Sequence, residues 1–119
     1  MVPPNIVSVH FLLLKNIPRE EAILSAMRKP NKKLRDALDA SYEGVVLADG
    51  HDNAIMGVAE GGGGPPRLVY DRDKVIQNLI AGGIEDYGEA IEFFEFNIAG
   101  AYVGEQTPLF LTKRKDILW

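Results

Sequence analysis

The sequence predicts a single α+β domain in which a small antiparallel or mixed sheet carries its helices on one face. Two observations lead to this prediction. Short β-branched runs are interspersed with runs of helical period, and glycines and prolines separate them. No linker or internal repeat divides the 119 residues, a length that suits one ordinary domain. We therefore expect residues 1–119 to form one domain.

The first half of the chain is expected to supply a strand, two helices and a hairpin. Residues 5–14 are largely β-branched, aromatic or aliphatic, which is typical of a strand. Pro18, followed by two glutamates, opens one helix. Asn31 is placed to cap a second helix at about 32–40. Two apolar runs within about 44–59 flank turn-forming residues, and this pattern predicts a hairpin.

The second half is expected to supply two strands that enclose two helices. The run Gly61–Pro66 predicts a loop, because glycine and proline interrupt regular structure. Asp71 or Asp73 can cap the first helix, and Gly82-Gly83 can end it. The expected bounds are about 67–70 and 108–112 for the strands, and about 73–81 and 86–101 for the helices.

Composition and charge narrow the classes of function. The absence of cysteine excludes disulfides, thiolate metal sites and a cysteine nucleophile, and it fits a reducing cytoplasm. No apolar run approaches the roughly 20 residues of a membrane span, so we expect no membrane association. The net charge is −4, and the basic segment 28–35 contains no aromatic residue to stack on bases. We interpret that segment as a solvated helix face, and direct nucleic-acid binding is not expected.

Asp49, His51 and Asp52 form the most metal-like cluster, because carboxylates and imidazole are common metal ligands. Ligands this close in sequence converge on one ion only with strain, and the same residues are typical of a turn. A turn is therefore the favoured interpretation, and a metal-dependent hydrolase is a minor alternative. No serine lies in a nucleophile elbow and no phosphate-binding loop is present, so we expect neither an enzyme nor a cofactor.

The long helix carries an acidic arc that contains one aromatic residue. At about 100° per residue, four glutamates project within this arc: Glu85, Glu89, Glu92 and Glu95. Phe96 projects between Glu85 and Glu89, away from the core side of the helix. Two interpretations stand. Either another segment covers Phe96, such as Trp119 or the N-terminal strand, or Phe96 is an exposed anchor for a partner.

Several motifs between residues 45 and 112 carry a resemblance to known proteins. They are Asp52–Gly57, Val69–Asp71 before a lysine-containing helix, and the closing pattern Phe-Asn-x-x-Gly-Ala-x-x-Gly-x-x-Thr-Pro at 96–108. In these motifs the chain resembles small uncharacterised proteins encoded by phages and prophages. The resemblance implies a phage or mobile-element gene that acts in a bacterial cytoplasm. Because that family has no established activity, it supplies no catalytic residues.

The leading hypothesis is a non-enzymatic accessory protein that binds a host protein, of the host-takeover or anti-defence type. Phe96 would be the aromatic anchor, and Glu85, Glu89 and Glu92 would attract a basic partner. The identity of that host protein does not follow from the sequence.

Two alternatives belong to different classes. A module that binds or sequesters a small molecule or nucleotide would place its pocket near Asn97, Tyr70, Gly61 and Gly62. A structural or assembly subunit would instead use the apolar helix in a contact such as a homodimer.

Overall fold

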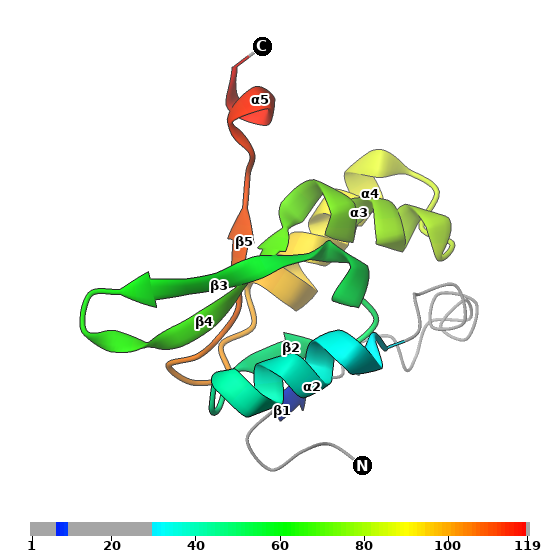
Figure 1. The fold of residues 1–119 in the computed structure, drawn as a ribbon. Helices are drawn as coiled ribbons and strands as arrows, with labels where there is room; N and C mark the ends of the chain where they lie inside the picture. Colours follow the sequence, from blue (N-terminus) through cyan, green and yellow to red (C-terminus); the bar gives the residue numbers. More distant parts are fainter. Residues whose placement is uncertain (1–6, 10–29, 119) are drawn as a thin grey trace.

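The computed structural model describes residues 7–9 and 30–118, and it confirms the α+β class. The helix expected to begin at Pro18 lies outside the described residues, as does most of the strand expected at 5–14. The strands are β1 (Val7–Val9), β2 (Val46–Ala48), β3 (Ile55–Gly61), β4 (Gly64–Asp71) and β5 (Leu109–Leu111). They form a parallel pair, β1-β2, and a mixed sheet of order β3-β4-β5 (Figure 1).

The hairpin lies later in the chain than the predicted one at 44–59, and that prediction is wrong. Strand β2 pairs in parallel with β1, whereas β3 pairs antiparallel with β4. The connection is a two-residue turn at Gly62 and Gly63, whose φ angles of 63° and 76° suit a type I′ turn. The segment expected to form the hairpin turn instead contains η2 (Asp52–Ala54), a short 3-10 helix. The predicted loop at Gly61–Pro66 is thus reduced to this turn, and both prolines lie in β4.

The expected caps of the helices α2 (Lys32–Ser41) and α3 (Arg72–Ala81) are confirmed. The Asn31 side chain accepts a hydrogen bond from the Leu34 amide at 3.1 Å. Asp71 caps α3 in the same way, by accepting from the Asp73 and Lys74 amides at 3.1 and 3.4 Å. A short helix near the C-terminus, α5 (Arg114–Ile117), was not expected from the sequence.

The expected helix at 86–101 begins as α4 (Tyr87–Phe93) and continues as a π-helix, η3 (Phe94–Ala99). Asp86 caps it, because its carboxylate accepts from the Glu89 amide at 2.9 Å. Within the π-helix, Phe94 and Ile98 are buried. Single π-helical turns inside α-helices are rare and occur frequently at functional sites.

The described core packs α3 and η3 against one face of the β3-β4-β5 sheet. The Phe110 ring of β5 stacks on Tyr70 of β4, with centroids 5.6 Å apart, and meets the edge of Phe94 at 5.1 Å. Leu68 and Tyr70 are fully buried on this face, together with Val75 of α3. The Phe94 ring therefore fixes η3 against the sheet. The guanidinium of Arg72 lies over this ring, 5.2 Å from its centroid.

Local contacts explain why glycine and threonine occur in the closing sequence pattern at 96–108. Gly104 has a φ of 108°, which favours glycine. The Thr107 hydroxyl donates to the Gly104 carbonyl at 2.6 Å and accepts from the Val103 amide at 2.9 Å. The Thr107 carbonyl accepts from Arg67 Nε at 2.7 Å. The segment after η3 is thereby attached to β4, and the chain enters β5 parallel to that strand.

Gly100 ends the π-helix at a position without room for a side chain. A Cβ atom there would lie 2.8 Å from the Glu95 carbonyl oxygen and 3.3 Å from that of Phe96. We expect Gly100→Ala to lower the free energy of unfolding by about 1–3 kcal/mol, because relief of the clash requires a backbone shift. Urea denaturation measures this loss. Gly57→Ala is the control, since a Cβ at Gly57 meets nothing within 4 Å; an equal loss in both variants would contradict the explanation.

Candidate functional site

The metal-like cluster of the sequence is part of a partly buried ion-pair network. Arg35 of α2 donates from Nε to Asp52 Oδ2 at 2.7 Å, and from Nη2 to Asp52 Oδ1 at 2.9 Å. The same Nη2 donates to Asp49 Oδ1 at 3.1 Å. The side chain of Asp52 is only 2% exposed, and the Asn31 amide also donates to it at 2.8 Å. The hydrogen bonds to Asp52 raise the pKa of the Arg35 guanidinium.

A second set of polar contacts joins the same segment to α3. Asn53 and Asn78 exchange two amide hydrogen bonds, at 3.1 and 2.8 Å. The Asn78 side-chain nitrogen also lies 3.1 Å from Nδ1 of His51. Because an amide nitrogen can only donate, this contact makes Nδ1 the acceptor and places the proton of the neutral ring on Nε2. Nε2 has no hydrogen-bond partner within the part of the chain that the structure describes.

His51 is therefore held as a neutral, structural side chain. It is fully buried, and burial lowers its pKa to about 4 although the nearby charge of Asp52 acts in the opposite direction. Both carboxylates of the cluster are occupied by Arg35. Over residues 7–9 and 30–118, no group of three or more His, Cys, Asp or Glu side chains is placed to hold a metal ion. The turn interpretation fits Asp49, His51 and Asp52, although the turn does not belong to a hairpin.

The acidic helix face differs from this partly buried network, because its side chains lie at the surface. Phe96 is 80% exposed, and no described element covers it. It lines a shallow hollow of about 240 Å³ together with Glu89, Glu92, Phe93 and Asn97. Three of the predicted partner-binding residues, Phe96, Glu89 and Glu92, are thus brought together. We call this surface of α4 and η3 the acidic aromatic face; the fourth predicted residue, Glu85, is exposed just before α4.

The residues expected for a small-molecule pocket are not brought together. Tyr70 is fully buried, and its hydroxyl accepts from the Ala48 amide at 2.8 Å. Burial raises the pKa of this hydroxyl. Gly61 and Gly62 line an open hollow of about 360 Å³ beside the hairpin turn, whereas Asn97 lines the hollow next to Phe96. A common pocket formed by these four residues is therefore absent from the described part of the chain.

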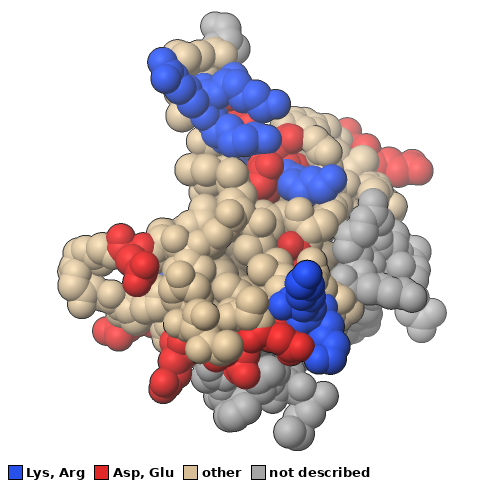
Figure 2. Space-filling view, viewed as in Figure 1, with Lys and Arg blue, Asp and Glu red and all other residues tan. Residues whose placement is uncertain are grey.

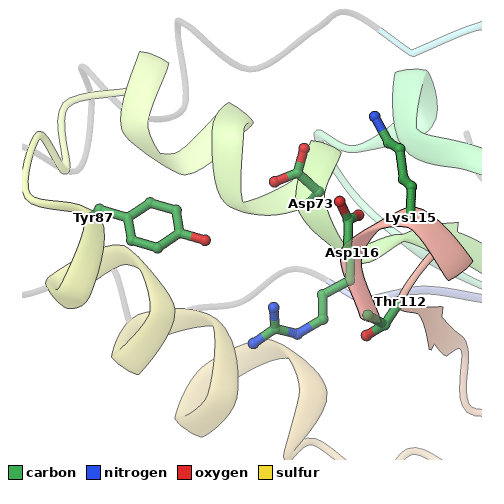
Figure 3. A pocket seen from close by; sticks show the side chains of 6 residues that line it. Asp73, Tyr87, Thr112, Lys115 and Asp116 are labelled. Carbon is green, nitrogen blue, oxygen red and sulfur yellow. The ribbon is translucent and has the colours of Figure 1, made fainter. Parts of the chain in front are cut away.

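A larger hollow, of about 470 Å³, lies between α3, α4 and the C-terminal segment. Figure 3 shows Tyr87 directed toward it from α4, with Asp73 on the opposite side. Its charges offset one another, because its lining contains two basic residues, Arg72 and Lys115, and two acidic residues, Asp73 and Asp116. No sequence motif indicated this hollow, since its residues are scattered over more than 40 positions. The balanced charge gives it no net preference for an anion or a cation.

Comparisons with protein-family models, curated proteins and solved structures find no match to this chain. Within the described residues, no helix is long and apolar enough to cross a membrane. The acidic aromatic face, where Phe96 is exposed beside Glu89 and Glu92, is the candidate site.

Removal of the Arg35 charge should destabilise the fold strongly. Arg35→Met keeps much of the aliphatic stem but leaves the buried Asp52 carboxylate without its ion pair, so we expect a loss of about 3 kcal/mol or more. Lys32→Met is the control on the same helix, because its ion pair with Asp36 is solvent-exposed and should contribute little. Urea denaturation of both variants measures the difference, and similar losses would contradict the structural role of Arg35.

The depressed pKa of His51 predicts a loss of stability in mild acid. Below pH 6.5 the unfolded chain binds a proton at His51, whereas the folded chain does so only below about 4. The contribution of neutral His51 to the free energy of unfolding is therefore fully present above pH 6.5. It is lost as the pH drops from 6.5 toward 4, which lowers the free energy of unfolding by about 3 kcal/mol.

The pH dependence of urea unfolding tests this. His51→Asn should lack this part of the pH dependence, although it lowers stability at neutral pH by removing buried volume. His10→Asn, at the chain's other histidine, is the control. The assignment fails if the wild type and His51→Asn lose stability in parallel between pH 6.5 and 4.

Proposed function

We propose that this protein is a non-enzymatic accessory protein of phage or prophage origin that binds a host protein through the acidic aromatic face. The observation that carries the proposal is the exposure of Phe96, which is 80% accessible at the centre of a helix face. Burial of a phenylalanine side chain against a partner contributes about 1.5–3 kcal/mol, enough to make it a binding hot spot.

The charges around Phe96 favour a basic partner. Glu89 and Glu92 share the hollow with Phe96, and Glu95 is exposed beside it. No lysine or arginine occurs between Gly83 and Gln106, so this helix contributes only negatively charged side chains to the face. Such a face speeds the approach of a positively charged surface and disfavours acidic ones. The partner is therefore expected to present basic residues around an apolar pocket that receives Phe96.

The biological setting rests on the resemblance of residues 45–112 to phage and prophage proteins. It favours a bacterial cytoplasm as the location, and host takeover or interference with a defence system as the role. Small accessory proteins of this kind commonly act by binding, which is an analogy between proteins of similar origin and size.

The ligand-binding alternative has less support. Its proposed residues lie in separate places, and Tyr70 is not accessible to a ligand. A metal-dependent hydrolase has less support still, because Arg35 occupies the carboxylates and His51 is buried.

Affinity capture from a bacterial host lysate tests the proposal. The tagged wild type should retain a host protein that Phe96→Asp and Glu89→Lys/Glu92→Lys lose, because these changes remove the anchor or reverse the charge. Met56→Asp is the matched control, since Met56 is a 49%-exposed apolar residue on a different element, β3. Circular dichroism verifies that each variant is folded. A host protein retained equally by all four proteins would contradict the role of this face.

A further inference from the structure

Residues 112–118, which follow β5 and include α5, form a projecting segment that we call the C-terminal arm. Figure 1 shows this arm extending from the end of β5 away from the sheet. Its base is fixed, because Leu111 pairs with Asp71 of β4 and Lys113 Nζ lies 3.0 Å from Asp71 Oδ2. Beyond that point Ile117 and Leu118 are 60% and 64% exposed. Two large aliphatic side chains at the tip of a projecting element favour a contact that buries them.

The arm and the acidic aromatic face have opposite charge. Lys113, Arg114 and Lys115 outnumber the single acid of the arm, Asp116, and basic side chains gather over α5 in Figure 2. Arg114 and Lys115 make no ion pair with any residue that the structure describes. One chain therefore presents a basic arm with an aliphatic tip, and also an acidic helix face with an apolar hollow beside Phe96.

The arm does not cover the acidic aromatic face of its own molecule. Its Lys115 and Asp116 line the same hollow as Tyr87, which lies at the beginning of α4. Phe96 is nine residues further along the helix, roughly 13 Å at the helical rise. Both Phe96 and the tip of the arm remain exposed in the single chain. A second copy can satisfy both surfaces at once, because two-fold symmetry repeats any contact between one arm and the other molecule's helix.

We propose that two copies of this chain exchange their C-terminal arms, with Ile117 and Leu118 of each copy docking beside Phe96 of the other. Arg114 and Lys115 then pair with Glu89 and Glu92. The inference rests on the proposed function, because it assigns an occupant to the same face. The host protein would have to displace the arm, so dimerisation would regulate access to Phe96.

Charge reversal in the full-length protein tests the exchange by sedimentation velocity. The wild type should dimerise with increasing concentration, and added salt should weaken the dimer because the contact pairs exposed charges. Arg114→Glu/Lys115→Glu reverses the arm, and Glu89→Lys/Glu92→Lys reverses the face. Each variant alone should dimerise at least tenfold more weakly than the wild type. Lys32→Glu/Lys33→Glu, an equal charge change on α2, should dimerise like the wild type.

The decisive sample is an equimolar mixture of the two reversed variants. In the mixture each arm meets a face of opposite charge on the other variant, so a heterodimer should form with affinity near that of the wild type. A wild type that stays monomeric at every concentration overturns the proposal. A mixture that stays monomeric also overturns the proposal. If the arm contacts the helix of its own molecule, a second molecule with the opposite charges cannot restore that contact.

The dimerisation experiment and the host-capture experiment can give different results, so each proposal can fail without the other. A dimer that forms as expected, together with no host protein lost on Phe96→Asp, supports the exchange and contradicts the host-binding proposal. A host protein that depends on Phe96, together with a monomeric wild type, supports host binding and overturns the exchange.

Discussion

The ion pair between Arg35 and Asp52 is the constraint on which the described fold most depends. It crosses between α2 and the segment that follows β2, and the side chain of Asp52 is almost completely removed from water. A carboxylate so placed requires a charged partner, because an unpaired buried charge is strongly unfavourable. Asn53 and Asn78 extend the network to α3. The residues that look most catalytic in the sequence thus hold three elements together.

Because these residues stabilise the fold, the side chains available for recognition are those of α4 and η3, which follow α3 in the chain. Phe94 and Ile98 anchor the π-helix in the core, while Phe96 between them faces solvent. The same short element therefore supplies a core contact to Phe110 and an exposed aromatic ring. Gly100 permits this arrangement, because the carbonyl oxygens of the last π-helical turn leave no space for a Cβ atom.

Sequence reasoning succeeded where the deciding interactions are local. Asn31 and Asp71 cap the helices that follow them, as their positions predicted, because a cap bonds to amides only two or three residues away. The glycines at 82 and 83 end α3 for the same reason. The acidic arc around Phe96 was also predictable, since it needs only the helical period.

The sequence did not predict features that depend on distant contacts. The hairpin was misplaced because Asp52 is bound by Arg35, 17 positions away, rather than by the local turn. The buried Asn78 was missed, because its partners precede it by more than 20 residues. The π-helix has no periodic signal of its own. The exposure of Phe96 depends on what the rest of the chain leaves uncovered, which the helical period alone does not determine.

Site-specific photo-crosslinking tests the central claim, that the scaffold presents Phe96 for recognition. A photoreactive phenylalanine analogue at position 96 should crosslink in host lysate to one discrete partner, and in the purified protein to the arm of a second copy. The same analogue at position 56, also exposed but on β3, should give neither product. The absence of any discrete product at position 96, or the same products at both positions, would contradict the account.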